Sequence, residues 1–205
     1  MMRTLFVGDL TNDPTRRDRA TELMALAPQF GLEPLDGTVK LVAAVTDGGH
    51  NPDPSALRLS ETAHRVEPWL GSNPRLLVGF DPLHTAMAMH CFPGTPVVLH
   101  VDGMGSGLPK LSLTGVSRLP GLYEVLTGTL RGASHVLVSN PRNASELQKQ
   151  WGVDPQRIHV APLQIGLAAP YYLEATRSLL TQTPTRFHWW MDLWYDPTPG
   201  SRRLA

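Results

Sequence analysis

Short apolar runs alternate with amphipathic stretches along most of the chain, which is the pattern of strands that alternate with helices. Lys40–Val45 continues after its lysine as an aliphatic run, as expected for a strand buried on both faces of a parallel sheet. The pattern therefore predicts an α/β protein with a single Rossmann-like, doubly wound parallel sheet and flanking helices. The six predicted strands are Thr4–Val7, Lys40–Val45, Arg75–Phe80, Pro96–Val101, His135–Ser139 and Arg157–Ala161.

Helices are predicted between these strands. Thr15–Phe30 places its apolar residues on one helical face and is closed by Gly31. Lys110–Leu119 fits either an amphipathic strand or an irregular linker, and both interpretations stay open. The other predicted helices are Ser55–Leu70, Leu83–Phe92, Pro120–Gly132, Pro141–Trp151 and Ala168–Leu180.

The stretch from Gly132 to Gly166 has the clearest local signals. Its first strand is followed by Asn140, a good N-cap, and by Pro141, which suits the first helical position. Gly152 ends the helix, and the chain after the second strand is predicted to be a loop from Pro162 to Gly166. A strand–helix–strand unit of this kind requires a right-handed crossover, which places the loops after both strands along one edge of the sheet.

The chain is predicted to have two parts. Residues 1–166 form the Rossmann-like domain, and residues 167–205 form a C-terminal helix and an aromatic-rich tail. This tail holds three of the five tryptophans of the chain. We expect it either to fold back over the sheet or to form an adhesive patch for a partner or a second copy.

Composition limits the classes of function. A chain of 205 residues suffices for one α/β domain and its core, but hardly for two. The 18 basic and 18 acidic side chains balance, which argues against a nucleic-acid or anionic-membrane surface. The longest apolar runs have the length of strands, so no transmembrane segment is expected. The N-terminal MMRTLFVGDL is interpreted as a first strand rather than a signal peptide.

Candidate chemistry is expected in the loops after the strands, because ligands of doubly wound sheets bind at the carboxyl edge. Gly8 and Asp9 follow the first strand, but the two further glycines of a dinucleotide fingerprint are missing. We therefore expect no nicotinamide cofactor and favour a polar turn over a phosphate contact here. Ser139 is explained as an ST-turn or helix cap, and the absence of a Gly-x-Ser-x-Gly motif disfavours an α/β-hydrolase.

The histidines and the single cysteine do not have the spacing of a metal site. His84 and His90 are six residues apart on a predicted helix, which places them on nearly opposite faces. The other histidines are scattered, so neither a metal nor any other cofactor is expected. Cys91 excludes an intrachain disulfide, fits a reducing compartment and is interpreted as a packed core thiol.

Two motifs in the stretch from Arg75 to Gly166 point to a known family. Pro93-Gly94-Thr95-Pro96-Val97-Val98 leads into a central strand, and Gly152-Val153-Asp154-Pro155 precedes the last one. Both resemble the acceptor-side, N-terminal domain of retaining GT-B glycosyltransferases, of the glycosyltransferase family 4-like type. The glutamates and the basic pair of the family's donor domain have no counterpart here.

The resemblance implies a protein that transfers a sugar from a nucleotide sugar to a hydroxyl acceptor, with a donor domain supplied in trans. The single Cys91 fits a cytoplasmic protein. Asp102 lies nearest to the family's strand-end His or Asp, where it would accept a proton or stabilise an oxocarbenium-like centre. Capping of its own glycine-rich turn explains Asp102 equally well. His100, two residues earlier, is favoured as a hydrogen-bonded core residue. The substrate-binding candidates are Gly8, Asp9, Asp81, His84, His100, Gly103, Ser139, Asn140 and Gly166.

An alternative from another class stays open. The chain would then be a non-catalytic Rossmann-like or flavodoxin-like binding module that uses its aromatic tail for protein interaction. Turnover of a nucleotide sugar, with and without a donor-domain partner, distinguishes the two hypotheses.

Overall fold

The computed structural model describes residues 1–8, 10, 14–38, 71–101 and 122–177. They form a six-stranded sheet in the order β2-β1-β3-β4-β5-β6, and every neighbouring pair of strands is parallel. The α/β class and the parallel sheet predicted from the sequence are therefore confirmed. The strands are β1 (Met2–Gly8), β2 (Leu32–Thr38), β3 (Leu76–Gly79), β4 (Val97–Val101), β5 (His135–Val138) and β6 (Ile158–Val160).

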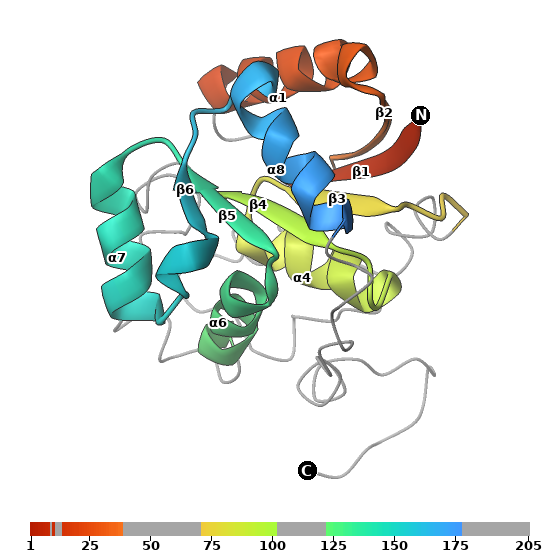
Figure 1. Ribbon diagram of the computed structural model, residues 1–205. Coiled ribbons are helices and arrows are strands. Elements are labelled where there is room, and N and C mark those ends of the chain that lie inside the picture. Colours follow the sequence, from red (N-terminus) through yellow and green to blue (C-terminus); the bar gives the residue numbers. More distant parts are fainter. Residues whose placement is uncertain (9, 11–13, 39–70, 102–121, 178–205) are drawn as a thin grey trace, which may run out of the picture.

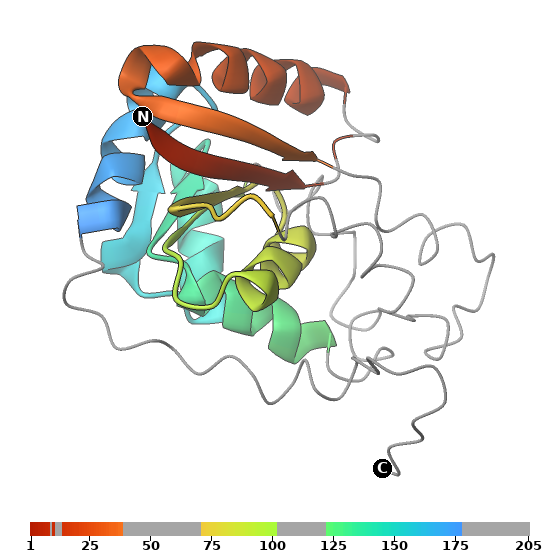
Figure 2. The ribbon, with the colours of Figure 1, turned by 90° about the vertical axis from the view of Figure 1, so that its right-hand side faces the viewer.

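Helices cover both faces of this sheet (Figures 1 and 2). On one face lie α1 (Pro14–Leu26), its 3₁₀ extension η1 (Ala27–Phe30) and α8 (Ile165–Arg177). The other face is covered by α4 (Pro82–Cys91), α6 (Leu122–Gly132) and α7 (Pro141–Trp151), and a short 3₁₀ turn, η3 (Pro155–Arg157), precedes β6. Because helices cover both faces of the sheet in the described part of the chain, the sheet is doubly wound, as predicted.

The strands alternate their side chains between two hydrophobic cores. In β1, Leu5 and Val7 enter the core under α4, α6 and α7, whereas Phe6 enters the core under α1 and α8. In β4, Leu99 enters the core under α4, α6 and α7, whereas Val98 enters the core under α1 and α8. Because both faces are covered, these strands are apolar at nearly every position, which is why the sequence shows them as continuous runs.

The termini of α7 follow the predicted signals. The Asn140 side chain accepts a hydrogen bond from the backbone N–H of Asn143 at 3.0 Å, and Pro141 occupies the first turn. Gly152 ends the helix in the left-handed conformation, with φ of 62°. Gly31 ends η1 in the same way, with φ of 77°. Local capping chemistry therefore sets these boundaries, as the sequence predicts.

Strand β2 was not predicted. Its sequence LEPLDGT contains Pro34, Asp36 and Gly37, all of which are disfavoured in strands. Among the described strands β2 is at one end of the sheet, where a proline can be accommodated because one side of the strand needs no ladder partner. The predicted strand Lys40–Val45, the predicted helix Ser55–Leu70 and the ambiguous Lys110–Leu119 lie outside the described residues.

Helix α8 begins three residues earlier than predicted. The backbone N–H groups of Leu167 and Ala168 both bond to the Gln164 carbonyl, so Gly166 lies in the first helical turn. The predicted loop from Pro162 to Gly166 was therefore wrong at its C-terminal end. Tyr172 and one apolar stripe of α8 are buried in the same core as the sheet, so the helix packs as part of this fold. Within the described parts of the chain, no helix combines the length and apolar character needed to cross a bilayer.

Candidate functional site

The sheet has a topological switch point between β1 and β3. The chain leaves β1 for β2 on one side and later returns to β3 on the other side. Connections that diverge in this way leave room at the carboxyl ends of the two strands, and open α/β sheets bind their ligands there. In this protein the two strand ends are Gly8 and the Phe80-Asp81 pair that follows β3.

Gly8 brings these two strand ends into close contact. The backbone N–H of Phe80 bonds to the carbonyl of Val7 at 2.8 Å. A Cβ on Gly8 would lie 2.9 Å from the Cβ of Phe80 and 3.1 Å from Oδ2 of Asp81. Carbon atoms do not normally approach this closely, so any larger residue would push β1 and β3 apart at their carboxyl ends.

Asp81 and His84 form a buried pair beside Gly8. Oδ1 of Asp81 accepts a hydrogen bond from the His84 backbone at 2.8 Å, which caps α4, and it lies 2.7 Å from Nδ1 of the His84 ring. An ionised Asp81 therefore fixes the imidazole tautomer with its proton on Nδ1. The side chain of Asp81 is 12% exposed and that of His84 is 1% exposed. The carboxylate is the more accessible of the two, and substrate contacts by either residue stay predictions.

His100 lies in the core beneath this edge. Its Nε2 is 2.6 Å from the hydroxyl of Tyr172 on α8, and its ring packs against Phe80 with a centroid distance of 5.9 Å. Burial raises the pKa of Tyr172 well above its ordinary value, so the hydroxyl stays protonated and donates to the imidazole. This geometry is the hydrogen-bonded core role that sequence reasoning favoured for His100.

The remaining described candidates lie further along the edge. Ser139 and Asn140 follow β5, and the Ser139 hydroxyl accepts a hydrogen bond from the Asn140 amide at 3.4 Å. Three strand spacings separate β1 from β5, about 14 Å, so these residues do not join the group around Gly8. Gly166 lies in α8, with open space where its Cβ would be. Asp9, Asp102 and Gly103 are outside the described residues.

Cys91 is half-buried at the end of α4 and packs against the core shared by α4, α6 and α7. Its burial raises the pKa of the thiol, which disfavours the reactive thiolate form. The packing interpretation of Cys91 fits this environment.

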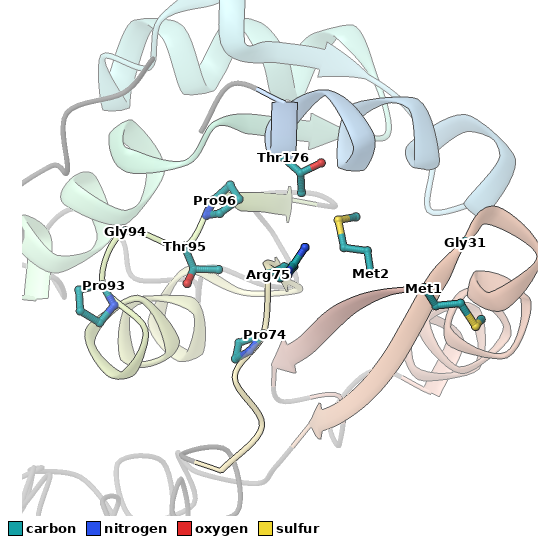
Figure 3. A pocket seen from close by; sticks show the side chains of 10 residues that line it. All are labelled: Met1, Met2, Gly31, Pro74, Arg75, Pro93, Gly94, Thr95, Pro96 and Thr176. Carbon is teal, nitrogen blue, oxygen red and sulfur yellow. The ribbon is translucent and has the colours of Figure 1, made fainter. Parts of the chain in front are cut away.

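A pocket of about 850 Å³ opens at the opposite, amino-terminal edge of the sheet (Figure 3). Met2, Arg75 and Pro96, at the starts of β1, β3 and β4, contribute to its wall together with Thr176 of α8. Its lining mixes polar and apolar surface, and among the described residues that line it Arg75 carries the one charged side chain. Because the doubly wound architecture places ligand chemistry at the carboxyl edge, we do not assign the substrate site to this pocket.

Sequence reasoning missed a cluster of polar aromatic side chains between the sheet and α8. His135 of β5 and His159 of β6 are 24 residues apart, yet His135 Nδ1 and His159 Nε2 lie 3.0 Å from each other. Tyr171 of α8 contacts both rings. A search for histidines at close sequence spacing cannot find this pair. The pair depends on the register of β5 and β6, which pairs Leu137 with His159 and which the sequence alone does not give.

Comparison of the chain with models of protein families finds no match, and comparison with curated proteins finds none either.

Proposed function

We propose that this chain is the acceptor-side half of a GT-B-type glycosyltransferase, which transfers a sugar from a nucleotide sugar to a hydroxyl acceptor. The observation that supports this most directly is the switch point between β1 and β3, where Gly8 brings the backbone of β1 against the Asp81 carboxylate. Backbone groups and a carboxylate side by side suit recognition of a hydroxyl-rich acceptor. The GT-B-like motifs between Arg75 and Gly166 support the same assignment.

In this proposal Asp81 and His84 position the acceptor at the carboxyl edge of the sheet. The Asp81 carboxylate is held by its two bonds to His84, so it needs little reorganisation when a hydroxyl approaches. Asp102, the residue after β4, supplies the catalytic carboxylate. It would accept the acceptor proton or stabilise positive charge at the anomeric carbon. Because β4 is the next strand after β3, both carboxylates follow neighbouring strands.

The donor nucleotide is bound by a second Rossmann-like domain in this scheme, supplied by another chain or a further segment. The chain described here would therefore bind nucleoside diphosphates weakly and transfer no sugar by itself. Steady turnover of a nucleotide sugar by this chain alone, at ordinary enzymatic rates, would contradict the proposed division of labour.

The direct test is Asp102→Asn in a complex reconstituted with a donor-side domain. The substitution keeps the size and turn-forming capacity of the side chain but removes its charge. We expect transfer to fall by about a hundredfold or more while the melting temperature stays unchanged. Asp154→Asn is the matched control. Asp154 caps η3, the turn before β6, and does not follow a strand at the carboxyl edge, so this variant should leave transfer unchanged. An Asp102→Asn variant with full activity and equal stability would remove the catalytic role.

One observation favours a second candidate. Among the described strands, the first five follow the order 2-1-3-4-5, which is the order of flavodoxin-like modules that bind small ligands at the same switch point. A non-catalytic binding module of this type would bind a small ligand there without turnover. Absence of transfer even with a matched donor domain, combined with saturable binding of a small ligand, would favour this candidate.

A further inference from the structure

The facing nitrogens of His135 and His159 lie as close together as two ligands of one metal ion. The two residues lie on adjacent parallel strands, and His135 Nδ1 and His159 Nε2 face each other at 3.0 Å. In metal sites with Zn–N bonds of about 2.0–2.1 Å, two nitrogens at right angles are about 2.9 Å apart and two tetrahedral ones about 3.3 Å apart. The observed separation falls within this range. A metal ion would replace the proton that the two rings now share, after a turn of the rings that directs both lone pairs toward it.

Tyr171 and Glu174 of α8 lie beside the two rings. The ring of Tyr171 stacks on that of His159 with a centroid distance of 4.3 Å and an interplanar angle of 24°, and it also contacts His135. Oε2 of Glu174 lies 4.0 Å from Nε2 of His135, the nitrogen opposite the one that faces His159. Histidine ligands commonly donate their second N–H to a carboxylate, which leaves the other nitrogen for the metal.

Burial lowers the pKa of His135, and His159 and Arg157 lower it further, while Glu174 acts in the opposite direction. Burial likewise lowers the pKa of His159, and Glu174 again opposes this shift.

We propose that His135 and His159 bind a divalent transition-metal ion of the kind that imidazole prefers, such as Zn²⁺, Ni²⁺ or Cu²⁺. Glu174 orients His135 from its second nitrogen. In the described residues no group of three or more His, Cys, Asp or Glu side chains is arranged to hold a metal, so the proposed site has two protein ligands. The site lies between β5, β6 and α8, away from the proposed acceptor edge, and does not depend on the proposed function.

The test is calorimetric titration of the full chain with Ni²⁺ at pH 7.5, after treatment with a chelator and dialysis. We expect one saturable site that His135→Gln and His159→Gln each weaken at least tenfold. Glu174→Gln changes a side chain that is 62% exposed, so it leaves the core intact, and it should weaken binding about tenfold. His90→Gln is the matched control, because His90 lies on α4, which covers the face of the sheet opposite to α8, and the variant should bind as the wild type does.

Circular dichroism of each variant verifies folding. If His135→Gln or His159→Gln unfolds, the Glu174→Gln titration and a thermal shift test the proposal. Ni²⁺ should raise the melting temperature of the wild type and of His90→Gln by several degrees, and that of Glu174→Gln by less. The proposal is overturned if the wild type shows no saturable binding up to millimolar Ni²⁺. It is equally overturned if folded His135→Gln or His159→Gln binds as tightly as the wild type, since the pair would then be a packing contact only.

Discussion

At the scale of single residues, two glycines determine how closely the elements at the carboxyl edge approach. Gly8 allows β1 to contact Phe80 and Asp81. Gly79, the last residue of β3, faces α4, and a Cβ there would overlap the Thr85 hydroxyl and lie 2.9 Å from Cδ1 of Leu99. The position of α4, and with it the Asp81–His84 pair, therefore depends on the absence of a side chain at Gly79.

Gly79→Ala should destabilise the protein by about 3 kcal/mol, because an extra methyl group in a filled core displaces its neighbours. Gly166→Ala is the matched control. Open space surrounds that position in α8, and alanine favours a helix, so stability should be unchanged or higher by up to about 1 kcal/mol. Urea unfolding of both variants measures the two values. Equal stability of Gly79→Ala and the wild type would show that α4 can shift without cost.

The His135–His159 pair should make stability depend on pH. The pKa of each histidine is lowered in the folded state, so between that value and the unfolded value of about 6.5 the unfolded chain binds more protons. The contribution of the pair is therefore fully present above about pH 6.5 and is lost as the pH falls through the folded pKa values. Urea unfolding from pH 8 to pH 5 should show a smaller loss of stability for a His135→Gln/His159→Gln double variant than for the wild type. Parallel curves of stability against pH for the two proteins would contradict the lowered pKa values of His135 and His159.

At the scale of elements, the sequence predicts helices and strands wherever local chemistry determines them. Asn140, Pro141 and Gly152 delimit α7 through contacts within a few residues, and the structure confirms them. Strand β2 could not be predicted in the same way, because its stability comes from seven paired positions along β1 rather than from its own Pro- and Gly-containing sequence. The early start of α8 has the same cause, since burial of Ile165 and Ala168 against the sheet extends the helix.

The residues of the candidate site also differ in whether the local sequence predicts their contacts. The strand-edge rule placed Gly8 and Asp81 at one edge, and the structure brings them into contact. The pairing of His135 with His159 depends on strand register, and the contact of His100 with Tyr172 joins residues 72 positions apart. No local pattern contains such information.

The contact between α8 and β4 has a specific prediction. Tyr172→Phe keeps the ring that packs edge-on against His100 but removes the hydroxyl that donates to Nε2 at 2.6 Å. A buried acceptor then loses its donor, so stability should fall by about 1–3 kcal/mol. Tyr171→Phe, one residue earlier and half-buried, is the control and should change stability by less than about 0.5 kcal/mol. Thermal melts compare the two. Equal effects would mean that the hydrogen bond to His100 does not anchor α8.

At the scale of the whole molecule, the described elements already bury both faces of the sheet. Helices α1 and α8 cover one core, and α4, α6 and α7 cover the other, with Tyr172 and Leu147 fully buried. The aromatic-rich tail, residues 184–205, is outside the described residues. Because helices already cover both faces of the sheet in the described part of the chain, we expect the fold to be stable without the tail, and a deletion can distinguish the tail's two expected roles.

Deletion of residues 184–205 should therefore leave a folded domain with a melting temperature within a few degrees of the wild type. The removed segment includes Phe187, Trp189, Trp190, Trp194 and Tyr195. Clustered aromatic side chains dominate interface energetics, so the truncated chain should also self-associate less than the full chain. Circular dichroism and sedimentation velocity at matched concentrations measure both properties. A large fall in melting temperature together with new dye-binding surface would show instead that the tail covers this domain's own apolar surface. Since Arg177 ends α8 well before the deletion, such a result could not come from loss of a described element.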